Sequence, residues 1–223
     1  MNLTLIYLDN PFWRVELARI PLFIGGINFD DKRIALEEFR SAKETGFLKD
    51  GTKLPFHQIP CLVVDGVPIA QTGAIARFCG KLSGLYPTED SISCALIDQF
   101  IDFVTDLTNL VYIPSNNPLT EDEKIEFRKK LAEGELARKL DMLEDNISES
   151  QSWMVGKEMT IADIAIWRGI GWLASDLVAG IPQPYFVNYP KITKIFKNVD
   201  KHPKISEWVK KTYGLNYNRG YIE

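Results

Sequence analysis

The chain has 223 residues, 45% of them hydrophobic and 25% charged, which is typical of a soluble globular protein with one large or two small domains. Its 26 Lys and Arg residues against 30 Asp and Glu give a net charge of −4, which argues against nucleic-acid binding. No stretch reaches the roughly 18 consecutive apolar residues of a membrane span.

The N-terminus and the cysteines predict a cytoplasmic protein. The opening residues MNLTLIYLDN lack a basic leader and pass directly into a strand pattern, so no signal peptide is expected. Cys61, Cys79 and Cys94 fall on a predicted strand and predicted helices without CxxC spacing, which fits a reducing compartment. The chain has only two histidines, and no metal site is expected.

The first fifty residues predict short strands that alternate with helices. The expected elements are a strand at 3–8, a helix at 12–24, a strand at 27–33, a charged helix at 34–43 and a loop at 44–52. Pro11 fits the first turn of the first helix, and Pro21 is expected to kink that helix or end it early.

Residues 53–84 carry the most informative pattern. The apolar run CLVVD at 61–65 predicts a buried strand, Asp65-Gly66 a hairpin turn, and 67–70 a returning strand before a helix that begins at Thr72. Pro60 enters a strand that looks central, where proline would cost a ladder hydrogen bond. A cis Ile59-Pro60 bond explains it and leaves the Ile59 main chain able to pair with another peptide.

The start of the helix at Thr72 predicts an anion site beside that peptide-binding edge. A helix N-terminus attracts a carboxylate through its free N–H groups and its dipole. At these positions Gln58-Ile59-Pro60, Gln71-Thr72 and Ile75-Ala76-Arg77 resemble the glutathione-site strand and helix of the glutathione transferases. The resemblance extends over nearly the whole chain and is nearest to the tyrosine-type sigma and alpha classes.

The resemblance implies an α/β plus all-α fold, with a thioredoxin-like domain at 1–85 and a helical-bundle domain at 86–223, joined through a linker at 86–90. Apolar spacing in the second half predicts helices at 92–111 and 120–146, the latter opened by a Thr120–Glu123 capping box. Asp163 resembles the family residue that caps the buried helix beginning at Thr160. After a proline-rich loop, two short helices close the chain. The last nine residues are expected either to fold over the site or to lack order.

The resemblance gives Tyr7 the catalytic role, as the phenol that hydrogen-bonds the glutathione sulfur, although a strand tyrosine can instead simply face the core. Gln71 and Thr72 would hold the γ-glutamyl carboxylate, Ile59 with cis Pro60 the peptide main chain, and Gln58 the glycyl end. Thr72 can also be a plain helix cap, and Gln58 an exposed polar residue.

Several charged residues have weaker assignments under the same resemblance. Arg14 would support the site electrostatically, and Lys53 or Lys49 would meet the glycyl carboxylate. Asp106 would reach the glutathione of the partner in a homodimer, whose interface would also include Arg77 and Phe56. Each of the charged residues can equally be a solvated surface charge. The loop before Arg14 and the loop at 44–52 are longer than the family pattern.

The electrophile would be a small hydrophobic molecule in a pocket formed by Phe12, Trp13 and Tyr112, although aromatic residues at helical spacing are usually core. The implied reaction is attack by the glutathione thiolate, with isomerase or peroxidase activity as further options. Glutathione is then a co-substrate, and no cofactor is expected. The rival interpretation is a non-catalytic relative, such as a lens crystallin or a ligand-storage protein.

Overall fold

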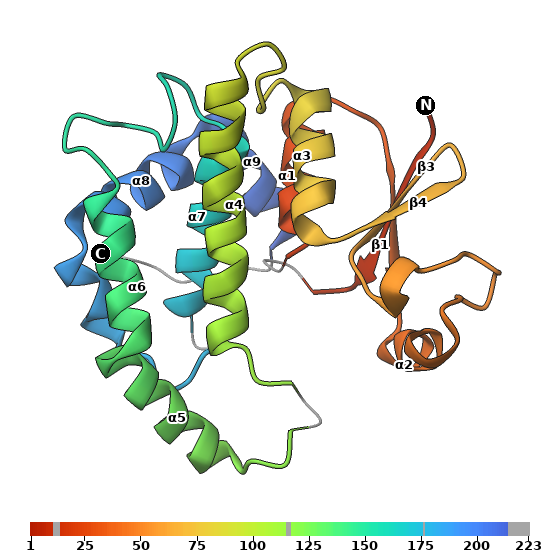
Figure 1. Ribbon diagram of the computed structural model, residues 1–223. Helices are drawn as coiled ribbons and strands as arrows, with labels where there is room; N and C mark the ends of the chain where they lie inside the picture. The colour runs from red at the N-terminus through yellow and green to blue at the C-terminus, as the bar shows by residue number, and fades with distance from the viewer. Residues whose placement is uncertain (11–13, 115–116, 176, 214–223) are drawn as a thin grey trace. The chain divides into compact units, whose positions relative to one another are not determined.

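The computed structural model describes residues 1–10, 14–114, 117–175 and 177–213 (Figure 1). It divides into two compact units, Met1–Cys94 and Ala95–Glu223. Within the described part of the chain, no helix is both long enough and apolar enough to cross a membrane.

The first unit is a four-stranded mixed sheet with helices on both faces (Figure 1). The strand order is β2-β1-β3-β4, with β1 parallel to β2 and antiparallel to β3, and β3 antiparallel to β4. The strands are β1 Leu3–Leu8, β2 Asp30–Ile34, β3 Cys61–Val64 and β4 Val67–Ala70. The helices are α1 Glu16–Ile24, α2 Leu36–Thr45 and α3 Thr72–Ser83, with a 3-10 turn η1 at Pro55–His57.

The two faces of β1 divide the core of this unit. Leu5 and Tyr7 pack with residues of α1 and α3, such as Leu22 and Ile75. Ile6, between them in sequence, packs on the opposite face with Ala42 of α2 and with Leu48 and Leu54. This is the two-residue alternation of a strand buried on both sides, which explains why β1 reads as a nearly continuous apolar run.

Two predicted elements in this unit had wrong bounds. The second strand begins at Asp30 and not at residue 27, although Ile27 and Phe29 still pack against the core. The next helix runs from Leu36 to Thr45 because Ile34 completes β2 and Ala35 stays extended, with φ −70° and ψ 152°. The predicted end of the first helix at residue 24 is confirmed, with Pro21 inside α1, and the predicted start at residue 12 lies outside the described residues.

The predicted loop at 44–52 is a packed turn. Gly46 ends α2 with φ +81°, and the chain folds back so that the Leu48 amide donates to the Thr52 carbonyl at 2.9 Å. Leu48 is only 3% exposed, and Lys32 of β2 pairs with Asp50 at the tip. The extra residues therefore add a buried anchor to the sheet face that α2 covers.

The second unit is helical. Its elements are α4 Ser91–Val111, whose first turn belongs to the first unit, α5 Glu121–Glu133, α6 Glu135–Asp145, α7 Ile161–Leu173, the 3-10 turn η2 Gln183–Asn188, α8 Pro190–Lys201 and α9 Pro203–Thr212. The single predicted helix at 120–146 was wrong, because Gly134, at φ −130° and ψ −107°, separates α5 from α6. The Thr120–Glu123 capping box is confirmed.

Helix α7 forms the core of this unit, since all of its residues are buried. It packs closely on α4, because a Cβ at Gly169 would lie 2.8 Å from Val104, and Arg168 donates to Thr108 at 3.0 Å. Asp163 caps it as predicted. Its Oδ1 accepts from the Met154 amide at 2.6 Å, and its Oδ2 accepts from the amide and hydroxyl of Thr160 at 2.7 and 2.9 Å.

Candidate functional site

The candidate site lies in the first unit, at one end of three neighbouring strands. The register pairs Ile6 of β1 with Cys61 of β3, and Cys61 with Ala70 of β4. Tyr7, Pro60 and Gln71 are the next residues at the same end of their strands. Residues that are 53 and 11 positions apart in the chain therefore lie side by side.

The centre of this end is the entry to β3. The Ile59-Pro60 peptide bond is cis, as the sequence predicts. Pro60 is buried, Ile59 is partly exposed and Gln58 is exposed. The hairpin that follows turns at Asp65-Gly66 with φ values of 47° and 87°, the left-handed pair of a type I′ turn, which confirms the predicted turn.

Gln71 joins β4 to α3 in an unusual backbone conformation, with φ 73° and ψ 119°. A non-glycine residue in such a region costs about 1–3 kcal/mol and is found most often at functional sites. Within the described ranges, no side chain caps the first turn of α3, which begins at the partly exposed Thr72. The helix therefore presents its positive end beside the exposed side chain of Gln71, as an anion site requires.

Tyr7 is 8% exposed and packs with the apolar residues between β1 and α1, so most of its ring belongs to the core. Arg14 lies in the turn before α1 and is partly exposed. Phe12 and Trp13, which we expected in the electrophile pocket, lie outside the described residues.

A buried charge network holds the chain on both sides of this turn, and sequence reasoning missed it. Arg19 and Glu16 are both 0% exposed, and Arg19 contacts Glu16 at 3.2 Å, Asp31 of β2 at 3.0 Å and the Asn10 carbonyl at 3.4 Å. Arg33 extends the network from Asp31 to Asp9. The available signal was the Glu16–Arg19 spacing of three on an otherwise apolar helix. These contacts fix the backbone that directly follows β1, the strand that contains Tyr7.

The remaining predicted residues come from other segments of the chain. Lys53 and Lys49 are exposed, and the Lys53 backbone bridges to Phe47. Asp106 belongs to the part of α4 in the second unit, and Tyr112, which is 44% exposed, follows the last residue of that helix. Over the described residues, no group of three or more His, Cys, Asp or Glu side chains could hold a metal ion.

Comparisons with known proteins match both parts of the chain. Residues 3–80 match the family model of the glutathione S-transferase N-terminal domain, and residues 102–212 match that of the C-terminal domain. Glutathione S-transferase 1 of Ascaris suum is 30% identical over 201 residues, which cover 87% of this chain and 89% of the relative.

Two further similarities extend the comparison. Hematopoietic prostaglandin D synthase of Gallus gallus is 27% identical, over 89% of this chain and 90% of that protein. The solved structure of rat hPGDS complexed with a quinoline has a TM-score of 0.79 at 23% identity and covers 97% of this chain and 100% of its own, which shows a shared fold.

Proposed function

This chain belongs to the glutathione S-transferase family, and on that premise we propose that the shared strand end of Tyr7, Pro60 and Gln71 is its glutathione site. The protein is an enzyme of this family with the thioredoxin-like and helical domains that the family models describe. Its reaction is the conjugation of the glutathione thiol to an electrophile. A non-catalytic role is not favoured by these relatives.

The observation that carries the proposed site is the register that brings three separate segments to one sheet end. Ile59, which is partly exposed, offers its main chain next to the cis bond to Pro60. Gln71 and Thr72 offer the uncapped first turn of α3 to the γ-glutamyl carboxylate. Gln58, exposed beside them, would contact the glycyl end.

Tyr7 is the proposed catalytic residue, because its position at the end of β1 places it next to Pro60 in the register. A free thiol with a pKa of about 8.5 is only a few per cent ionised at neutral pH. Lowering that pKa by about two units would make thiolate the main species, which corresponds to about 2.7 kcal/mol. A phenol hydrogen bond to the sulfur anion would supply about 1.5–3 kcal/mol of this.

The proposal also covers the charges near the site, the second substrate, the domain boundary and the location of the enzyme. Arg14 would add positive potential near the sulfur, and Lys53 would meet the glycyl carboxylate. Tyr112 would contact a small hydrophobic electrophile together with Phe12 and Trp13. The domains would divide at residues 85 and 86. We place the enzyme in the cytoplasm, where it would serve detoxification, with isomerase or peroxidase chemistry as options.

A homodimer is also part of the proposal, with Asp106 reaching the glutathione of the partner subunit. Phe56 supports an interface, because it is 71% exposed and is held at φ +57°. An aromatic ring so exposed is a suitable anchor for a partner surface. Arg77 of α3 would lie in the same interface. Sedimentation at micromolar concentration tests this, and a monomer would contradict it.

The test of the function is Tyr7→Phe. Retention on immobilised glutathione should stay nearly unchanged, because Ile59, Gln71 and Thr72 hold the peptide. Turnover of a chlorodinitrobenzene substrate at neutral pH should fall roughly ten- to a hundredfold. The pH–rate profile should move upward, because the bound thiol loses a donor to its anion. Equal turnover and an equal profile would return Tyr7 to a purely structural role.

A further inference from the structure

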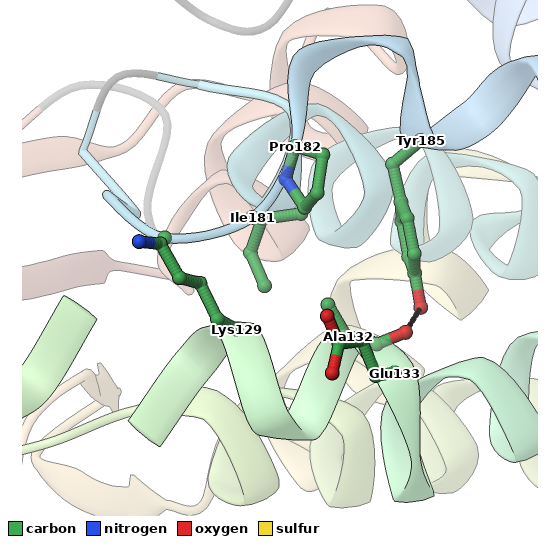
Figure 2. Close-up of a pocket in the computed structure, with 7 residues that line it drawn as sticks. Lys129, Ala132, Glu133, Ile181, Pro182 and Tyr185 are labelled. Carbon is green, nitrogen blue, oxygen red and sulfur yellow. Dashed lines mark hydrogen bonds between the residues drawn. The ribbon is translucent and has the colours of Figure 1, made fainter. Parts of the chain in front are cut away.

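A pocket lies within the helical unit, between α5 and the loop that leads into η2 (Figure 2). Its volume is about 420 Å³, which falls in the range of about 300–1,000 Å³ for small-molecule sites. Lys129, Ala132 and Glu133 line it from α5, Gly180, Ile181 and Pro182 line it from the loop, and Tyr185 lines it from η2.

Contacts at both ends of the loop keep this space open. At one end Arg128 donates to the Ala179 carbonyl at 3.3 Å. Gly180, at φ +105°, approaches α5 so closely that a Cβ would lie 2.6 Å from the Ile125 carbonyl oxygen. At the other end the Tyr185 hydroxyl donates to the Ala132 carbonyl. Because the loop is fixed on both sides of Ile181, the gap is a preformed part of the fold.

The Tyr185 end is rigid. Its ring meets Phe186 and Tyr189 edge-on, with centroids 5.7 and 5.8 Å away. Burial raises the pKa of Tyr185, so its hydroxyl remains a protonated donor to Ala132 across the neutral range. Figure 2 shows Ile181 pointing toward α5 between Lys129 and Tyr185. The apolar surfaces of Ile181 and Tyr185 form the pocket wall opposite the helix.

Two opposite charges stand on the helix side of the pocket. Lys129 and Glu133 are four residues apart on α5, so they lie on one face about 6 Å apart along the axis. Both side chains are exposed. Among the described residues, neither has an ion pair or a hydrogen bond, with each other or with any third group. One cation and one anion are thus available to the same bound molecule.

We propose that this pocket binds a small zwitterion with an apolar body, of the class of α-amino acids with aromatic or branched side chains. Lys129 would meet the carboxylate, Glu133 the ammonium group, and Ile181, Pro182 and the Tyr185 ring the apolar body. A ligand with a single charge gains one of these contacts and faces a like charge at the other. The proposal does not depend on the glutathione site, which belongs to the other unit.

Three probes with one apolar body test this: L-phenylalanine, 2-phenylethylamine with only the cation, and 3-phenylpropionate with only the anion. Titrations of the full chain, followed by amide chemical shifts, should perturb Ala132, Gly180 and Ile181 and give phenylalanine the lowest Kd. Excess glutathione should leave that Kd unchanged. Displacement by glutathione would place the amino acid in the other site and overturn the proposal.

Charge variants assign the contacts. Lys129→Gln should weaken the binding of phenylalanine and phenylpropionate by about two- to fivefold, and it should not weaken the binding of phenylethylamine, which loses only a like charge. Glu133→Gln should weaken the binding of phenylalanine and phenylethylamine by a similar factor, and it should not weaken the binding of phenylpropionate. Lys130→Gln and Glu126→Gln, exposed on α5 outside the pocket lining, should alter none of the three Kd values. Equal binding by wild type and both pocket variants, or no perturbation at millimolar ligand, would refute the site.

Discussion

Asp163→Asn is the sharpest test of how α7 is held in the helical unit. The carboxylate is 0% exposed and accepts three hydrogen bonds, from the Met154 amide and from both donors of Thr160. The amide has nearly the same shape, but one of its two oxygen positions becomes an NH₂ group. At least one donor therefore faces another donor, and one hydrogen bond to a charged acceptor is lost.

The expected loss at pH 7 is about 1.5–3 kcal/mol in the free energy of unfolding, the value of one charged hydrogen bond. Chemical denaturation of the two proteins measures it, and a change in midpoint without a change in slope is required. Glu123→Gln in the exposed capping box of α5 is the matched control. It should change stability much less, because water can replace the lost acceptor.

The same pair of proteins should also show a defined pH dependence. Burial raises the pKa of Asp163 to about 6 from 3.8, against the hydrogen bonds, which lower it. For an acid with a raised folded pKa, the stabilising term is fully present below the unfolded pKa and is lost as the pH rises through about 6. The stability of wild type relative to Asp163→Asn should therefore be larger at pH 5 than at pH 7 by about 1 kcal/mol. A difference in stability that is small at both pH values and independent of pH would refute this role of the carboxylate.

Three further substitutions have expected outcomes. Thr72→Ala should clearly weaken glutathione binding and lower the melting temperature only slightly. Calorimetry measures the affinity and thermal unfolding measures the stability. Intact affinity with lost stability would make Thr72 only a helix cap. Glu144→Gln should cost about 1–2 kcal/mol in denaturant unfolding, because its two oxygens accept from the Lys191 and Ile192 amides at 2.8 and 2.9 Å, and wild-type stability would contradict this. Gly180→Ala should cost about 1–3 kcal/mol by the same assay, since its Cβ would clash with a carbonyl oxygen.

The features predicted correctly from the sequence are those encoded by adjacent residues. The turn at Asp65-Gly66, the cis bond before Pro60 and the start of α3 at Thr72 each rest on two or three neighbouring side chains. The break at Gly134 was missed because a glycine costs a helix only about 1 kcal/mol. The helical spacing of the residues around it therefore predicted one continuous helix.

Features that depend on distant packing could not be predicted in the same way. The strand end that joins Tyr7 to Pro60 became visible only with the register of β1 on β3. The buried contact of Arg19 with Asp31 needs β2 beside α1, and no local pattern specifies that. The pocket beside Tyr185 likewise requires the loop to meet α5, from which it is separated by more than forty residues.

The complete burial of α7 has a consequence for how proteins with this architecture can change over time. A helix with no solvent-facing side offers no position where a new side chain is neutral, so α7 should tolerate few substitutions. Helix α5 is the opposite case, because Ala132 is its only buried residue among those described. Lys129 and Glu133 lie on that tolerant surface, so new ligand preferences could arise there through single substitutions that leave the fold intact.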